Sequence, residues 1–245
     1  MKKKHIASNI VLFVCLTILL FAALYLGSLL LNYHKSNAEY DNIRQTIISN
    51  FSETEEDSFP IDWEALKEVN PDVVAWIRFP SLDISYPIVQ GTDNDQYLHT
   101  TVEGTSAYAG AIFLDAACSQ DFSDDNTVIY GHNMRNRSMF GNLKFLYRDE
   151  AVLRENEYFW IYTPTDTYKC NIFSLGNMPV ADERFHFVDG PDEQKAAYIQ
   201  FCMEKNQYKM PVTAELSDRI ITLSTCVATR NDSYRLQIHA VIEKK

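Results

Sequence analysis

The sequence lacks the short cysteine motifs that bind zinc or exchange disulfides. Its five cysteines form no Cys-x-x-Cys pair, and no group of cysteines and histidines has the spacing of a zinc site. It also lacks a Lys/Arg-rich stretch after the N-terminus, and 33 acidic residues outnumber 22 basic ones for a net charge of −11. We therefore expect no metal, no cofactor and no nucleic-acid partner, because nucleic-acid binding depends on clustered positive charge.

Internal repeats and low-complexity tracts are missing as well. The 245 residues, 46% of them apolar, are enough for one sizeable domain with a short appendage. An exported domain of this size can be stable on its core without disulfides. The spacing of Cys118, Cys170 and Cys202 leaves their pairing open, and we expect these residues to be buried or free.

One segment near the N-terminus lacks charge altogether. Residues 10–31 are 22 uncharged, mainly apolar residues, about 33 Å of helix, which exceeds the roughly 30 Å of a bilayer core. Lys2, Lys3 and Lys4 precede the segment, so the positive-inside rule predicts a cytoplasmic tail at 1–9, a single-pass anchor at 10–31 and an external remainder. The alternative, a cleaved signal peptide, has a shorter apolar region and an Ala-x-Ala-like site, which does not follow Leu31.

The region 32–60 links this anchor to the rest of the chain. Residues 33–50 carry Tyr40, Ile43 and Ile47 on one helical face, and the acidic stretch 52–58 reads as a solvated linker. A short amphipathic helix is expected at 61–69, ended by Asn70-Pro71. An extracellular domain then occupies 61–245.

Short runs rich in β-branched and aromatic residues, separated by turn residues, fill most of this domain. Eight such runs with little helix predict a mainly β fold, a closed or nearly closed barrel. Two helical insertions are expected at 138–146 and 191–206, the second with Pro191 at its start and acids in its first turn. The predicted strands are 73–79, 84–89, 111–114, 127–130, 158–162, 168–175, 220–224 and 235–242.

Cys226 is the first candidate for chemistry. The strand Thr222-Leu-Ser-Thr-Cys226 ends in this cysteine, and the polar loop 228–233 follows. A cysteine at a strand end can meet a substrate, and it acts as a nucleophile when a base generates its thiolate. The alternative is a small buried hydrophobic residue.

His132 ends another predicted strand, in Val128-Ile-Tyr-Gly-His132. Histidine titrates near neutrality and can serve as acid, base or ion-pair partner to a cysteine. The alternative is a structural histidine. His99, His186 and His239 compete for the catalytic role, although His239 lies in an alternating pattern and is expected on a strand face.

Arg235 opens the last predicted strand, nine residues after Cys226. If the runs 220–226 and 235–242 pair as a hairpin, the loop returns Arg235 to the neighbourhood of Cys226. A guanidinium there can donate two hydrogen bonds to a carbonyl or to a tetrahedral oxyanion. Arg230, inside the loop, is the competing residue, and an ordinary surface charge is the simpler alternative.

These three segments together resemble the sortases. Thr222-Leu-Ser-Thr-Cys226 is similar to the family's Thr-Leu-x-Thr-Cys segment, Tyr130-Gly-His-Asn133 to its histidine segment, and Tyr234-Arg235-Leu236 to its arginine segment. They occur in the right order behind an N-terminal anchor, and the resemblance covers roughly 61–245. It implies a closed eight-stranded sortase-type β-barrel.

Further segments resemble class B of this family. They are Gln90-Gly-Thr-Asp-Asn-Asp-Gln-Tyr-Leu98, Met139-Phe-Gly-Asn-Leu143, the N-terminal helices and the helix at 191–206 in the long connection before the cysteine strand. Class A members that bind calcium place acids near that connection. Here Asp182, Glu183 and Asp189 form no organised ligand set, so no metal is expected.

The resemblance implies a cysteine transpeptidase that joins secreted proteins to the cell wall. Cys226 would attack the Thr carbonyl of a C-terminal sorting signal, Asn-Pro-x-Thr-Asn-like or Pro-x-Thr-Gly-like, and His132 would protonate the departing amine. Arg235 would hold the substrate backbone or the oxyanion. An amine of a peptidoglycan precursor would then resolve the acyl-enzyme. The resting protonation of Cys226 and His132 stays open.

By position in the matching motifs, Asn94, Leu98 and Ser224 are candidate substrate contacts. Their alternatives are a turn-capping asparagine, a core leucine and a strand serine.

Three rival functions stay open at this point. An exported cysteine peptidase or wall-peptide hydrolase would release its product to water, although papain-like sites place Asn or Asp behind the histidine. A membrane-tethered binding module would have an inert Cys226. A third option keeps the chemistry but transfers the protein to pilin lysines, which the class B features disfavour.

Overall fold

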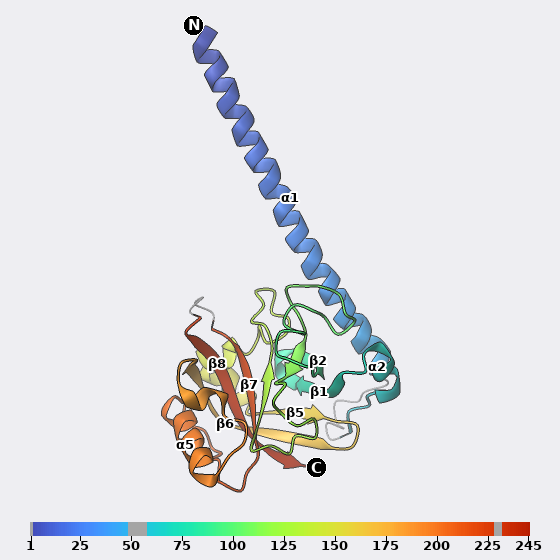
Figure 1. Cartoon of the computed structure of the whole chain (residues 1–245), viewed down its shortest axis with the longest axis vertical. Coiled ribbons are helices and arrows are strands. Elements are labelled where there is room, and N and C mark those ends of the chain that lie inside the picture. Colours follow the sequence, from blue (N-terminus) through green and yellow to red (C-terminus); the bar gives the residue numbers. More distant parts are fainter. Residues whose placement is uncertain (1, 49–57, 228–231) are drawn as a thin grey trace.

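Eight strands close into a barrel in the computed structural model of this chain (Figure 1). The structure describes residues 2–48, 58–227 and 232–245. Around the barrel the strands follow the order β1-β2-β3-β4-β7-β8-β6-β5. Their bounds are β1 (Val73–Phe79), β2 (Ile84–Val89), β3 (Ile112–Leu114), β4 (Asn126–Tyr130), β5 (Tyr158–Tyr162), β6 (Thr167–Pro179), β7 (Ile220–Cys226) and β8 (Tyr234–Lys244). The predicted barrel is confirmed.

The strand predictions succeed because the β-branched and aromatic runs are buried. β1, β2 and β5 begin and end where the sequence predicts, whereas β6 extends four residues beyond its predicted end. Barrel residues such as Trp76, Ile77 and Ile112 are fully buried in one continuous core. Burying an aliphatic or aromatic side chain of this size contributes roughly 1.5–3 kcal/mol.

Three neighbouring strands set the position of the candidate residues. β4 and β7 are parallel, with Tyr130 opposite Ser224, so the residues that follow both strands emerge at the same end of the barrel. β7 and β8 form the predicted hairpin, in which Cys226 lies directly opposite Arg235. The sequence-based expectation that the loop returns Arg235 to Cys226 is therefore confirmed.

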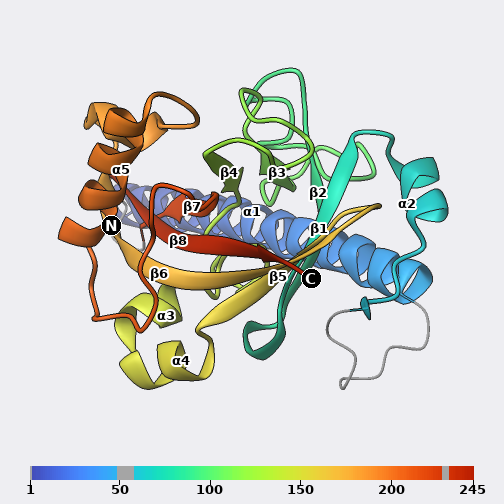
Figure 2. The ribbon, with the colours of Figure 1, turned by 90° about the horizontal axis from the view of Figure 1, so that it is seen from below.

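The helices of the barrel domain agree only in part with the bounds predicted from the sequence. α2 (Trp63–Val69) begins after Asp62, whose side chain accepts a hydrogen bond from the Ala65 amide, and α5 (Asp192–Glu204) follows Pro191. Figure 2 shows α5 and α2 on opposite sides of the barrel. The helix expected at 138–146 is wrong in its bounds, because Met139 lies in an isolated β-bridge, residues 140–143 form turns, and α3 (Lys144–Arg148) begins later. α4 (Glu150–Glu155) was not predicted.

The N-terminal region forms one helix, α1 (Lys2–Ile47), of 46 residues (Figure 1). No break separates the apolar segment from the helix expected at 33–50, whose last two residues, like most of the acidic linker at 52–58, lie outside the described residues. Within the final turns, Tyr40, Ile43 and Ile47 are buried against the barrel domain, which matches their helical spacing. Most side chains of residues 12–28 are exposed, and α1 is long and apolar enough to cross a membrane.

Candidate active site

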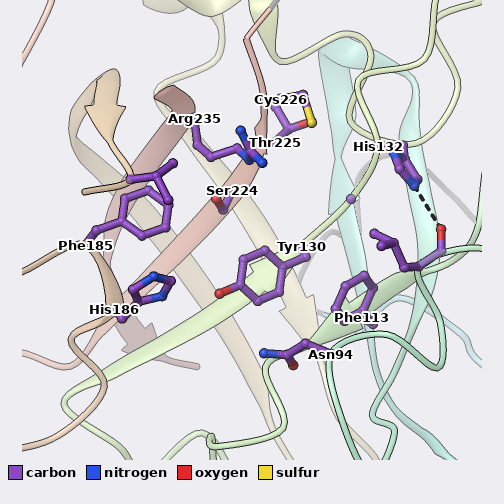
Figure 3. Close-up of a pocket in the computed structure, with 13 residues that line it drawn as sticks. Asn94, Phe113, Tyr130, His132, Phe185, His186, Ser224, Thr225, Cys226 and Arg235 are labelled. Carbon is purple, nitrogen blue, oxygen red and sulfur yellow. Dashed lines mark hydrogen bonds between the residues drawn. The ribbon is translucent and has the colours of Figure 1, made fainter. Parts of the chain in front are cut away.

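A cavity of about 270 Å³ opens at the end of the barrel where β4 and β7 finish and β8 begins (Figure 3). All six residues proposed from the sequence line it, namely Asn94, Leu98, His132, Ser224, Cys226 and Arg235. They come from four separate segments of the chain. The fold therefore gathers the whole predicted set at one place.

Cys226 is the last residue of β7 and is exposed, whereas the two residues before it are buried. Its carbonyl accepts a hydrogen bond from Asn133 Nδ2 at 2.8 Å, which fixes the backbone at the strand end. The other cysteines of the barrel domain, Cys118, Cys170 and Cys202, are buried free thiols, as expected. Burial raises the pKa of Cys118 to about 12, so that thiol is a poor nucleophile.

His132 follows β4 through Gly131. Its Nε2 lies 2.8 Å from the Leu98 carbonyl oxygen, shown as the dashed line in Figure 3. A carbonyl oxygen only accepts, so Nε2 carries the hydrogen, and in the neutral ring Nδ1 is left with the lone pair. The backbone of Leu98 thus selects the tautomer, and Nδ1 becomes the nitrogen able to exchange a proton.

Two more rings surround the imidazole of His132. Its centroid lies 5.4 Å from that of His99 and 5.3 Å from that of Tyr108, with interplanar angles of 15° and 25°. Burial lowers the pKa of His132, and the neighbouring His99 lowers it further, while the hydrogen bond to Leu98 acts in the opposite direction. His132 therefore stays neutral to lower pH than an exposed histidine.

Arg235 projects its guanidinium into the same cavity, toward Thr225 and Cys226 (Figure 3). Its Nη1 donates to the carbonyl oxygens of Asp232 and Tyr234 at 3.1 and 3.0 Å. These bonds anchor one end of a group that has five N–H donors, so donors remain for a substrate. The competing Arg230 lies outside the described residues.

The three candidate substrate contacts also have structural bonds. Asn94 donates to Asp115 Oδ2 at 3.2 Å and accepts from the Ala116 amide at 2.8 Å. The Leu98 carbonyl holds His132. Ser224 is buried, and its Oγ accepts from Gln237 Nε2 at 3.5 Å. Their place in the cavity is clear, and their contact with substrate stays a prediction.

Sequence reasoning missed the apolar side of the cavity. Phe113, Tyr130, Val180 and Phe185 line it, and His186 lies across the cavity from His132 (Figure 3). Val180, Phe185 and His186 belong to the β6–β7 connection, which no local pattern ties to Cys226. Tyr108 was missed too, although a tyrosine that is 62% exposed is a common mark of a binding surface.

One of the acids considered for calcium, Asp182, has a structural role. Asp182 accepts hydrogen bonds from the backbone amide and the guanidinium of Arg184. Within the described residues, no group of three or more His, Cys, Asp or Glu side chains is placed to hold a metal ion.

Comparison with known proteins gives this site a family context. A sortase domain model matches residues 77–243. Sortase B of Listeria monocytogenes is 35% identical over 164 residues, which cover 66% of this chain and 65% of that protein, just under two thirds of its length. Sortase B of Staphylococcus aureus is 26% identical over 198 residues, 78% of each chain.

Solved structures agree with the sequence comparisons. The crystal structure of Bacillus anthracis sortase B in complex with AAEK1 has a TM-score of 0.75 and 28% identity, and the match covers 88% of this chain and 100% of that one. A Staphylococcus aureus sortase B–substrate complex has a TM-score of 0.77 and 25% identity, with 87% and 99% covered. The chain therefore belongs to the sortase family of cysteine transpeptidases, and its relatives place it in class B.

Proposed function

We propose that this sortase is a membrane-anchored transpeptidase that cleaves a sorting signal after Thr and transfers the protein to a peptidoglycan amine. One observation carries the proposal: an exposed Cys226 lies opposite Arg235 and shares a cavity with His132. The arrangement supplies a nucleophile, a proton-transfer group and an oxyanion donor within one site.

Acylation uses these groups in order. Nδ1 of His132 takes the Cys226 proton, and the thiolate attacks the Thr carbonyl carbon. Arg235 donates hydrogen bonds to the developing oxyanion. The tetrahedral intermediate collapses to a thioester as the C–N bond breaks, and Nδ1 returns the proton to the departing amine.

Transfer runs through the same steps in reverse order. The acceptor amine attacks the thioester carbonyl, gives a proton to His132, and expels the Cys226 thiolate. Water is the competing nucleophile, so the ratio of transfer to hydrolysis measures how well the acceptor is held.

The lining of the cavity fits a sorting signal with a proline near its centre. Val180, Phe185 and Phe113 give it an apolar side, and the polar groups gather at Cys226 and Arg235. This arrangement suits Asn-Pro-x-Thr-Asn-like or Pro-x-Thr-Gly-like peptides, with Thr beside Cys226. Asn94, Leu98 and Ser224 are the proposed contacts.

The anchor is part of the proposal. The apolar segment of α1 would cross the membrane once, at 10–31, with the tail 1–9 in the cytoplasm. Residues 32–60 would connect it to the extracellular catalytic domain at 61–245. The three lysines before the apolar run favour this orientation.

Peptide cleavage by the full chain in detergent micelles tests the proposal. Quenched fluorescent Asn-Pro-Gln-Thr-Asn, Ser-Pro-x-Thr-Gly and Leu-Pro-x-Thr-Gly peptides would be supplied with and without an amine. We expect cleavage after Thr and an amine-linked product. Cys226→Ala and His132→Ala should abolish turnover, and Arg235→Ala should lower kcat/KM by about 100-fold or more. Arg154→Ala, at an exposed position of α4, is the matched control.

Other outcomes identify the rivals. Acid release that an amine leaves unchanged would indicate a hydrolase. Absence of cleavage together with slow alkylation of Cys226 would indicate a tethered binding module. Preference for a lysine side chain over wall-peptide amines would indicate pilin assembly.

A further inference from the structure

The loop 133–139, here called the arginine loop, connects the nucleophile to α1. At one end, Asn133 donates to the Cys226 carbonyl and pairs with Met139 across an isolated β-bridge. At its middle, Asn136 Nδ2 lies 3.3 Å from Asn37 Oδ1 of α1. A few residues thus join the catalytic strand end to the helix proposed as membrane anchor.

The contact with α1 lies close to the apolar segment. Asn37 is six residues after Leu31, a rise of about 9 Å along a helix. In Figure 1, β8 runs from its first residue, Tyr234, toward the C-terminus at the far end of the domain. Cys226 pairs with the start of β8, so it lies at the end of the barrel nearer the N-terminus of α1.

The charge of this region differs from that of the whole chain. Between Asp125 and Asp149 the sequence has no acidic residue, although the chain carries a net charge of −11. Its four basic residues form no ion pair within the part of the chain that the structure describes. They are Arg135, Arg137, Lys144 and Arg148.

Three of these cations, Arg137, Lys144 and Arg148, lie near one another. Burial lowers the pKa of Lys144, and the charges of Arg148 and Arg137 lower it further. Arg137 and Lys144 both lie over the ring of Phe145, at 5.2 and 5.6 Å. Arg135 and Arg137 are exposed. A positive cluster of this kind, without an acidic partner among the described residues, fits an external anion.

We propose that the arginine loop lies on the anionic headgroups of the bilayer, and that the catalytic cavity therefore faces the membrane. The occupant is a lipid surface because α1 holds the loop beside the end of its apolar segment, while Tyr40, Ile43 and Ile47 pack the domain against the same helix. Basic residues next to a membrane anchor are attracted to anionic lipid. The inference rests on the proposed anchor and not on the transpeptidase chemistry.

Amide hydrogen exchange of the full chain in nanodiscs tests this orientation. A Cys226→Ala background removes turnover, so that failure of the proposed reaction does not affect the result. Nanodiscs of phosphatidylcholine alone would be compared with nanodiscs that also contain phosphatidylglycerol. We expect exchange in 133–139 to slow several-fold with the anionic lipid, because each basic residue strengthens such a contact about fivefold. High salt should reverse the effect.

Charge variants complete the test. Arg135→Gln with Arg137→Gln should abolish the difference between lipids, whereas Lys244→Gln with Lys245→Gln, at the C-terminal end of β8 on the far side of the domain (Figure 1), should preserve it. Equal exchange in both nanodiscs, with the protein firmly inserted, would overturn the orientation alone. Equal slowing by inorganic phosphate without anionic lipid would overturn it too, by indicating a small-anion site. Failure to insert would overturn both the orientation and the anchor.

Discussion

Gly131 controls where His132 lies. A Cβ atom at this position would come within 2.5 Å of Ile112 Cδ1 and 2.7 Å of Phe140 Cδ2. Gly131→Ala should therefore displace His132, and we expect kcat/KM for peptide cleavage to fall about 100-fold, the cost of a 1 Å misplacement. Circular dichroism checks that the variant folds. Gly190→Ala is the matched control, since its Cβ would meet the flexible end of Gln194. Unchanged cleavage would mean that Ile112 and Phe140 yield.

His99 tunes the proton affinity of His132. A charged imidazole beside His132 disfavours a second positive charge, which contributes to the lowered pKa. His99→Gln removes that charge, so the pKa of His132 should rise and the acid limb of kcat/KM should move to higher pH. Nuclear magnetic resonance titration of the His132 ring measures this directly. His186→Gln, on the other side of the cavity, should leave it unchanged, and a fall after His99→Gln would contradict the argument.

At the scale of elements, the sequence predicts strands better than turns. β-branched and aromatic runs bury themselves wherever they pair, so their bounds follow from composition. The helix expected at 138–146 fails because Arg137 and Met139 have φ angles of 70° and 53°, a left-handed conformation uncommon outside glycine. The Met139 amide bonds Tyr86 Oη from another strand instead. No local pattern predicts such a contact.

The candidate site also contains residues that local sequence patterns predict and residues that they do not. Cys226, His132 and Arg235 were predictable because each stands at a strand end, beside turn residues. Tyr108 reaches the ring of His132, and Phe185 reaches the cavity, through long connections, and their position depends on the closed barrel rather than on neighbouring residues. The continuity of α1 was missed because the sequence changes from apolar to polar after Leu31. The i to i−4 backbone hydrogen bonds of a helix can continue through such a change.

α5 covers a buried polar group that makes stability depend on pH. Nδ1 of His239, fully buried, lies 3.1 Å from Tyr198 Oη and 3.0 Å from Thr222 Oγ1. Burial lowers its pKa from the ordinary 6.5 to about 3. Between these values the unfolded chain binds a proton that the folded chain rejects, so stability is complete above pH 6.5 and is lost as the pH falls toward 3.

From pH 7 to pH 5 this group should cost about 2 kcal/mol of unfolding free energy. Urea unfolding at both pH values measures the loss. His239→Gln should remove that part of the pH dependence whatever its absolute stability, while His186→Gln, an exposed residue, should preserve it. An equal pH dependence in His239→Gln would show that other groups are responsible.

At the scale of the whole molecule, α1 reaches the active site through three contacts in series. Tyr40 Oη donates to the Gly110 carbonyl at 2.8 Å. Gly110, at φ 57°, approaches so closely that a Cβ would lie 2.4 Å from the Leu98 oxygen. That oxygen accepts the bond from His132. The helix therefore supports the tautomer of His132 as well as the domain.

Tyr40→Phe leaves the Gly110 carbonyl without its partner while preserving the ring packing against Tyr86, whose centroid is 5.4 Å away. We expect the unfolding free energy to fall by about 1–3 kcal/mol and kcat/KM to fall with it. Urea unfolding and peptide cleavage measure the two effects. Tyr33→Phe, at a half-buried position on the same helix, should change stability by less than about 0.5 kcal/mol.

Because the helix is unbroken, the number of residues between its apolar segment and the domain sets the orientation and the height of the domain. α1 has no hinge between Leu31 and Ser36, so one residue inserted there turns the domain by about 100° and lifts it about 1.5 Å. Seven residues restore the original direction to within about 20° but raise the cavity by roughly 10 Å. The direction in which the cavity faces and its distance from the apolar segment are thus set separately. The direction depends on the fraction of a helical turn that an insertion adds, and the distance depends on the total length of the helix.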